Sequence, residues 1–195
     1  MATNEIFHYG IPGMKWGVRR FQNEDRTWTE AGKRRYGRGS KTVFVSGSSK
    51  TQEKDSPYRR TLPKAIRSEL DSYILAGHKV IVGDAPGIDR QVQNYLHNKR
   101  YENVEVYGPG TKVRYSADSK WKTNPIDAPE YEVMSKEWLA AKDIEMEKVA
   151  DFGLAVVLDE GAKATRKNVE RLISHNKDVK VYELSKLGKE YDKWA

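Results

Sequence analysis

From Lys41 onward, short apolar runs alternate with longer segments that combine apolar and polar residues. The runs are rich in Val, Ile, Leu and Phe and predict strands over 42–46, 79–82, 104–107, 154–158 and 179–182. The longer segments predict helices over 62–75, 88–99, 131–149 and 165–176. In the first helix, apolar residues recur at 62, 66, 70 and 74, the spacing of one helical face. Residues 111–133 are polar and contain two prolines, which predicts a long loop.

This alternation of strands and helices predicts the fold class. Strands separated by helices form parallel sheets with helices packed on both faces. We therefore expect an α/β domain over residues 42–195, a Rossmann-like three-layer sandwich with a mostly parallel sheet.

The first 41 residues have a different composition. They contain six glycines and six interspersed aromatic residues, without a sustained helical or strand period. Nine basic and four acidic residues give this segment a net charge of +5, out of +7 for the whole chain. We expect a small irregular basic N-terminal arm over 1–41 that contacts nucleic acid or an acidic protein surface. The alternative is a solvated, partly disordered arm.

The composition excludes several classes of protein. The chain has no cysteine, which excludes disulfides and cysteine-based metal sites. No apolar run is long enough to span a membrane, and we expect a protein without a signal peptide that has no membrane partner. The four histidines are dispersed, so we expect no metal ion, and we expect no cofactor. Neither a Gly-x-Ser-x-Gly elbow nor P-loop spacing occurs, and no catalytic residue is assigned.

Three predicted strands end in turns suited to ligand binding: 46–49, 83–89 and 159–165. In a parallel sheet these turns lie on the same edge, so they converge although they are distant in the sequence. Backbone amides at 47–49 and 85–88 and the hydroxyls of Ser48, Ser49 and Thr165 are candidate phosphate donors. Asp84 and Asp89 are candidate partners of ribose hydroxyls, or else helix caps. The complete predicted ligand-binding set is Gly47, Ser48, Ser49, Gly83, Asp84, Ala85, Gly87, Asp89, Lys142, Asp143, Gly161 and Thr165.

The same stretches resemble a known superfamily. The segments 43–48, 83–89 with Gln93, 101–107, 142–153 and 161–168 are similar, in this order, to the SLOG superfamily of Rossmann-like nucleotide-binding domains. This superfamily includes DNA-processing protein A and the LOG phosphoribohydrolases. The resemblance covers about residues 42–184 and implies a nucleotide pocket without specifying an activity.

The chain departs from the superfamily's pattern at one turn. Where its members usually carry Ser-x-Gly-Thr, this chain reads Ala162-Lys163-Ala164-Thr165, so that a hydroxyl and a glycine are missing. The LOG signature Pro-Gly-Gly-x-Gly-Thr is also absent. These departures favour binding over phosphoribohydrolase turnover.

The N-terminal arm carries a second resemblance. Residues 8–20, His-Tyr-Gly-Ile-Pro-Gly-Met-Lys-Trp-Gly-Val-Arg-Arg, with 29–36, are similar to a short module of phage and prophage proteins. The resemblance does not imply a biochemical role. Aromatic and arginine anchors suit a docking peptide for a virion or host protein, and the same side chains suit contact with nucleic acid.

Together these observations predict a phage or prophage protein that binds a nucleotide or nucleotide-derived ligand, for sensing or sequestration, as in anti-defence. The first alternative is a nucleotide N-glycosidic hydrolase, and the second is a structural phage protein with a vestigial pocket. The expected location is the cytoplasm of an infected or lysogenic bacterial host, or the virion. Homo-oligomers are a further expectation, based on the superfamily.

Overall fold

The computed structural model describes residues 29, 40–52, 54, 61–159 and 161–185. All described helices and strands belong to the unit that begins at Ser40. The predicted arm over 1–41 lies outside the described residues, apart from positions 29, 40 and 41, and it stays a prediction.

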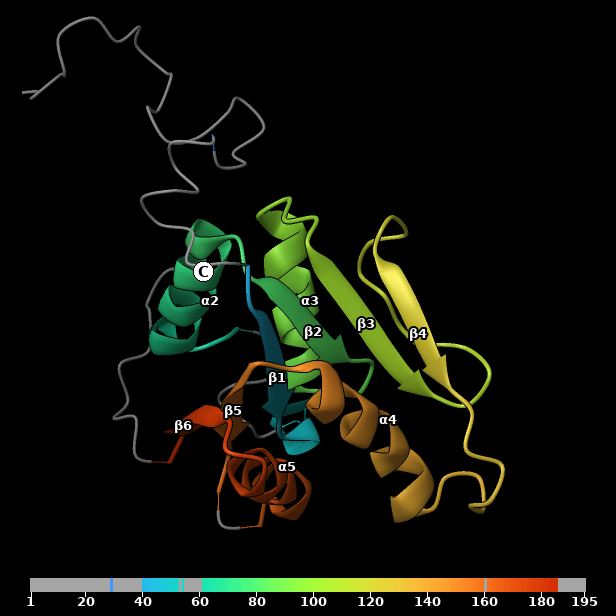
Figure 1. The fold of residues 1–195 in the computed structure, drawn as a ribbon. Coiled ribbons are helices and arrows are strands. Elements are labelled where there is room, and N and C mark those ends of the chain that lie inside the picture. The colour runs from blue at the N-terminus through green and yellow to red at the C-terminus, as the bar shows by residue number, and fades with distance from the viewer. Residues whose placement is uncertain (1–28, 30–39, 53, 55–60, 160, 186–195) are drawn as a thin grey trace, which may run out of the picture. The chain divides into compact units, whose positions relative to one another are not determined.

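Strands and helices alternate along the described chain, as the apolar pattern predicted (Figure 1). The strands are β1 (Thr42–Gly47), β2 (Lys79–Gly83), β3 (Val104–Pro109), β4 (Lys122–Ile126), β5 (Phe152–Val157) and β6 (Asp178–Glu183). The helices are the short 3-10 helix η1 (Ser49–Gln52), α2 (Lys64–Ala76), α3 (Ile88–Asn98), α4 (Lys136–Val149) and α5 (Lys163–Ser174).

The strands form one sheet in the order β4-β3-β2-β1-β5-β6, and every neighbouring pair is parallel. The chain moves outward from β1 to β4 and then returns to the other side of β1 as β5. The strand order therefore reverses between β1 and β5. In open parallel sheets a ligand crevice lies at such a switch point, outside the carboxyl ends of the strands.

The direction of chain travel also determines which face of the sheet each helix covers. Because crossover connections are right-handed, helices on the outward path and on the return path pack on opposite faces. Alternate strand residues accordingly enter two apolar clusters, one with α2 and α3 and the other with α4 and α5. Within β1, Val43 and Val45 belong to the first cluster and Phe44 belongs to the second. The predicted Rossmann-like three-layer sandwich is confirmed.

Two sequence predictions were wrong in detail. The predicted loop over 111–133 contains β4, a mostly exposed edge strand whose polar residues and Pro125 obscured the strand pattern. The predicted helix over 131–149 begins only at Lys136, because the Ser135 hydroxyl accepts a hydrogen bond from the Trp138 amide (3.1 Å) and caps the helix there.

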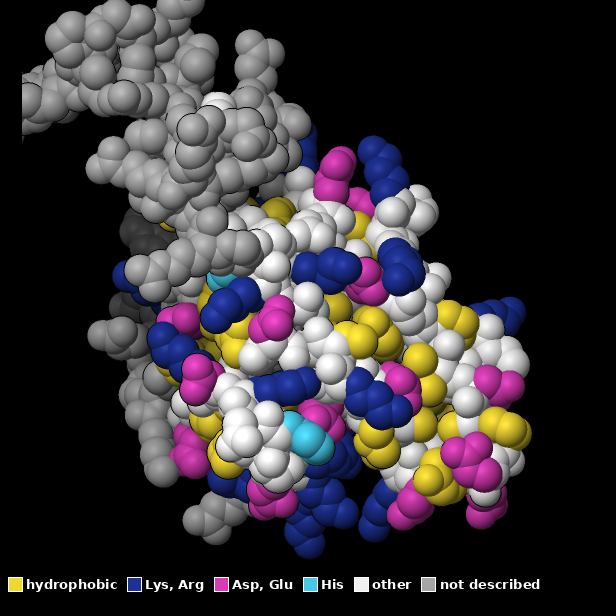
Figure 2. Space-filling model, viewed as in Figure 1, with side chains coloured by type: hydrophobic (Ala, Val, Ile, Leu, Met, Phe, Trp, Pro, Cys, Tyr) yellow, Lys and Arg dark blue, Asp and Glu magenta, His cyan; other side chains and the backbone are white. Residues whose placement is uncertain are grey.

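Acidic and basic side chains are interspersed over the visible face of the described residues, with apolar side chains between them (Figure 2). This mixture fits the nearly balanced charge of the chain beyond its basic arm. Among the described helices, none has the length and apolar character that crossing a membrane requires.

Gln93 connects the end of β2 to the segment between β3 and β4. Its side chain is fully buried, donates to the Gly83 carbonyl (2.8 Å) and accepts from the Ala117 amide (3.0 Å). One buried side-chain amide thus pairs with a strand carbonyl and a loop amide, and a buried polar group that loses its partner keeps its desolvation cost.

We expect Gln93→Leu to lower the free energy of unfolding by about 2–4 kcal/mol, since it removes two buried hydrogen bonds and leaves their partners unpaired. Urea denaturation measures the effect. Asn98→Leu, at an exposed position of the same helix, serves as the control and should change stability by less than about 0.5 kcal/mol. Equal stability of Gln93→Leu and the unaltered protein would contradict the assigned role.

Candidate functional site

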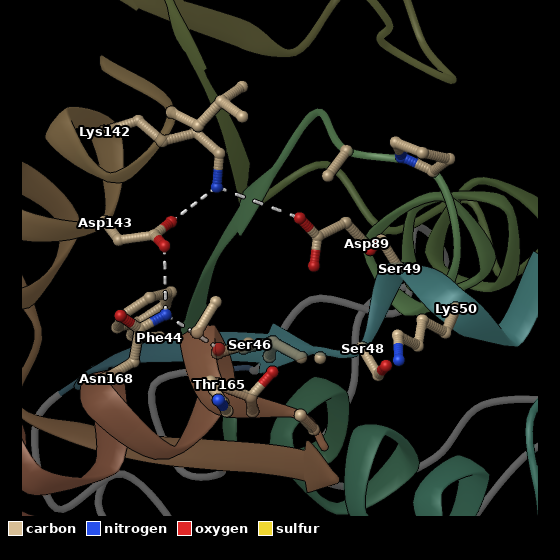
Figure 3. Close-up of a pocket in the computed structure, with 18 of the residues that line it drawn as sticks. Phe44, Ser46, Ser48, Ser49, Lys50, Asp89, Lys142, Asp143, Thr165 and Asn168 are labelled. Carbon is tan, nitrogen blue, oxygen red and sulfur yellow. Dashed lines mark hydrogen bonds and ion pairs between the residues drawn. The ribbon is translucent and has the colours of Figure 1, made fainter. Parts of the chain in front are cut away.

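A cavity of about 400 Å³ lies at the switch point, at the carboxyl ends of the strands (Figure 3). Its walls come from four parts of the chain: the turn after β1, the β2–α3 turn, α4, and the start of α5. Arg114, from the segment that follows β3, completes the lining. Cavities of this size and place are typical of small-molecule sites in α/β proteins.

A buried cluster of charges forms the floor of the cavity. The Lys142 ammonium lies 2.5 Å from a carboxylate oxygen of Asp143 and 3.9 Å from one of Asp89 (Figure 3). The side chains of Lys142 and Asp89 are each only 7% exposed. Lys142 and Asp143 lie on α4 and Asp89 lies in the first turn of α3, so the cluster links helices from opposite faces of the sheet.

Burial and neighbouring charges alter the acidity of this cluster. Burial raises the pKa of Asp89, the Lys142 charge lowers it, and the Asp143 charge raises it again, with a net result of about 7. For Lys142, burial alone lowers the pKa, but the charges of Asp143 and Asp89 outweigh burial and raise the pKa above its usual value. Lys142 therefore stays cationic, while Asp89 gains and loses its proton near neutral pH. Such a perturbed carboxyl in a cleft is typical of functional sites.

A chain of hydrogen bonds extends the cluster toward α5 and β1. The Asn168 side-chain amide donates to Asp143 (3.1 Å) and to the Ser46 hydroxyl (3.0 Å), and its carbonyl accepts from Arg171 (2.9 Å). Asn168 and Ser46 are both buried. These bonds hold the Asp143 carboxylate in place beside Lys142.

Two buried hydroxyls face the cavity across the switch point. Ser48 follows β1, Thr165 lies in the first turn of α5, and they are 6% and 3% exposed. Within the part of the chain that the structure describes, neither hydroxyl has a hydrogen-bond partner, although Figure 3 shows both at the cavity. Both residues are buried overall, yet their hydroxyls line the cavity without a protein partner, so they are available to a ligand.

Lysine side chains add positive charge beside these hydroxyls. Lys50 in η1 and Lys163 at the start of α5 both line the cavity. The Lys50 ammonium reaches across the switch point, since a Cβ built on Gly161 would lie 3.6 Å from it. The Lys163 amide already donates to the Gly161 carbonyl (2.8 Å), but the positive end of the α5 dipole still favours an anion here.

The predicted amide cradle is wrong at two positions. The Ser48 amide donates to the Val156 carbonyl (3.1 Å), and the Ile88 amide donates to the Ser48 carbonyl (3.3 Å). These bonds fix the turns to each other and to β5, so a ligand does not find these two donors free.

Nine of the twelve predicted site residues line the cavity: Gly47, Ser48, Ser49, Ala85, Asp89, Lys142, Asp143, Gly161 and Thr165. Asp84 does not, because its carboxylate is fully enclosed and accepts from the Arg114 Nε (2.9 Å), guanidinium NH2 (2.5 Å) and backbone amide (2.9 Å). Gly83 lies beneath the charge cluster, where a Cβ would meet an Asp89 carboxylate oxygen at 2.3 Å. Gly87 makes the turn, with φ at 88°.

Sequence reasoning missed Lys50, Arg114, Lys163 and Asn168 as parts of the predicted site. Lys50, directly after the first predicted turn, and Lys163, in the third, were detectable from their places beside the hydroxyls. Arg114 had no local signal, since its partner Asp84 is 30 residues away. In the described residues, no group of acidic and histidine side chains is arranged to hold a metal ion.

Comparison with known proteins adds one finding. Residues 2–23 match the model of a family of unknown function (DUF7211), which covers a small part of the chain, outside the described residues. No curated protein matches the chain.

The acidity of Asp89 gives a test of the cluster. The Asp89 pKa rises from 3.8 to about 7 on folding, so the folded state holds more protons between these values and loses stability as the pH rises through them. The Asp89→Asn variant has no carboxyl group to ionise at this position, so it does not lose stability in this way. From pH 5 to pH 8, we expect the stability of the unaltered protein relative to Asp89→Asn to fall by on the order of 2 kcal/mol.

Urea denaturation at the two pH values measures this difference. Asp127→Asn, at an exposed position, is the matched control and should show no such change. A stability difference for Asp89→Asn that does not depend on pH would contradict the raised pKa.

Proposed function

We propose that the domain binds a nucleotide or a nucleotide-derived ligand in the switch-point cavity, for sensing or sequestration. The observation that carries the proposal is a pair of cavity-lining hydroxyls, Ser48 and Thr165, that have no hydrogen-bond partner among the described residues. They lie beside two lysines and opposite a buried carboxylate cluster. One cavity thus offers donors for an anion and acceptors for hydroxyl groups. A phosphorylated ribose needs both.

The phosphate end of the proposed site lies at the start of α5. Thr165 and Ser48 would donate their hydroxyls, and Lys50 and Lys163 would supply positive charge. The missing Ser-x-Gly-Thr turn removes a hydroxyl and a glycine from this wall. Lysines from both sides of the switch point offset that loss in the proposed site.

The ribose end lies at the charge cluster. Asp89 and Asp143 present carboxylate oxygens near the cavity floor, and ribose hydroxyls are suitable donors to them. Lys142 stays between the two carboxylates and limits their mutual repulsion.

A second candidate function, N-glycosidic hydrolysis, is favoured by the Asp89 pKa of about 7. A protonated Asp89 would give its proton to the departing base as the C–N bond breaks. Water would add to the ribose C1′, and its proton would pass to the ionised Asp143. Acids and bases work best when their pKa lies near the working pH.

Two wider parts of the proposal depend on resemblance. Similarity to SLOG domains over about 42–184 supports a nucleotide ligand, and the phage-like string at 8–20 supports a phage or prophage setting. We propose that the basic arm docks on a virion or host component, with nucleic-acid contact as the alternative.

For the binding proposal, we expect a panel of nucleoside mono- and diphosphates to include members that raise the melting temperature. Replacing both hydroxyls, by Ser48→Ala with Thr165→Val, should weaken such binding about tenfold or more while leaving the melting temperature of the free protein within a few degrees. Differential scanning fluorimetry and calorimetric titration measure both effects.

Ser72→Ala, on α2 and away from the cavity, is the control for loss of a hydroxyl. If no nucleotide raises the melting temperature of the unaltered protein, the proposal fails and the vestigial-pocket alternative is favoured.

For the hydrolase candidate, we expect chromatography to detect free base after incubation with a bound nucleotide. Asp89→Asn should bind the nucleotide but release base at least about 100-fold more slowly, since it has no proton to give. Binding by the unaltered protein without any released base would contradict hydrolysis and leave binding as the function.

A further inference from the structure

The lining also has a part with a different chemistry from the phosphate end. Pro86, Arg114, Met134 and Leu139 contribute three apolar side chains and one planar cation to it. Arg114 follows β3, whereas α5 follows β5, and two strands of the sheet separate β3 from β5. Arg114 is therefore placed away from the proposed phosphate contacts.

Arg114 is held rigidly. Three of its N–H groups point to the fully enclosed Asp84 carboxylate, at 2.5 to 2.9 Å. Asp84 fits there because residue 108 is glycine, where a Cβ would lie 2.4 Å from an Asp84 oxygen. The neighbouring Tyr115 ring packs 4.5 Å from the Arg90 guanidinium, which fastens the same segment to α3.

The pairing with Asp84 neutralises the Arg114 charge but leaves part of its surface open. The Arg114 side chain is 36% exposed and lines the cavity, while its partner is completely enclosed. A neutralised guanidinium attracts an anion less than a free one does. Its planar face still stacks on flat rings, and its remaining N–H groups still donate hydrogen bonds.

Met134 contributes a flexible thioether side chain to the same part of the lining. It is 62% exposed, lines the cavity, and has a φ of 70°, a backbone conformation that is costly for a methionine. Nothing in its own packing accounts for that cost, since most of the residue is exposed. Strain of this kind is found at ligand sites, and a thioether packs well against aromatic rings.

We propose that Arg114 and Met134 form a subsite for the heteroaromatic base of the ligand, in which the ring lies between the guanidinium and the thioether. This inference rests on the proposed function and deepens it, because it assigns a binding place to the base. The base is the part that distinguishes one nucleotide from another. Arg114 then determines specificity, and Asp84 positions it.

The test compares ligands with and without a base. Titration calorimetry is carried out with the four ribonucleoside 5′-monophosphates and with ribose 5-phosphate, on the full chain. We expect at least one nucleotide to bind about tenfold or more tightly than ribose 5-phosphate. Arg114→Lys keeps a cation beside Asp84 but loses the planar fork, and it should remove most of that preference while changing ribose 5-phosphate affinity by less than about twofold.

Met134→Gly provides a second variant that is expected to fold, because glycine accepts a positive φ. Its melting temperature should equal or exceed that of the unaltered protein, while its preference for nucleotides over ribose 5-phosphate should fall about threefold or more. Val133→Gly, at the exposed neighbouring position, controls for an added glycine and should leave the preference unchanged.

The possible failures are distinguishable. If the unaltered protein binds nucleotides and ribose 5-phosphate equally well, or if the variants weaken both by the same factor, the base subsite is wrong while the proposed function stands. If neither kind of probe binds, the proposed function is wrong and the subsite with it.

Discussion

The Lys142 ammonium is buried between carboxylates from two helices that cover opposite faces of the sheet. Removing one partner of a buried charge pair costs about 3–5 kcal/mol, so each member requires the others. The cluster also restricts residue 83 to glycine, because a Cβ there would collide with the Asp89 and Lys142 side chains. Burial of the same cluster raises the Asp89 pKa to about 7. The fold and the chemistry of the site thus depend on the same charges.

The walls of the cavity form three zones of different chemistry. Near α5 they offer hydroxyls and lysines, in the centre they offer carboxylates, and beyond β2 they offer a neutralised arginine among apolar side chains. In the proposed function, each zone would receive a different part of a nucleotide. The order of the zones follows the order of the strands, because each turn is carried by its own strand.

The apolar pattern predicted the fold well, because strands buried on both sides leave continuous apolar runs such as 43–45. It missed β4, an exposed edge strand with a proline, which lacks such a run. Convergence of the three turns was predictable from parallel topology. The role of Asp84 was not, since a carboxylate after a strand looks the same whether it faces a ligand or an arginine 30 residues away.

The pairing of Asp84 with Arg114 has an evolutionary consequence. A chain that loses the arginine leaves a fully enclosed carboxylate without its partner, and a chain that enlarges Gly108 displaces that carboxylate. Removing the positive charge at 114 or enlarging residue 108 is therefore expected to destabilise the domain unless residue 84 changes as well. Ligand preference at this part of the cavity would then change through coordinated replacements at residues 84, 108 and 114, rather than through one residue at a time.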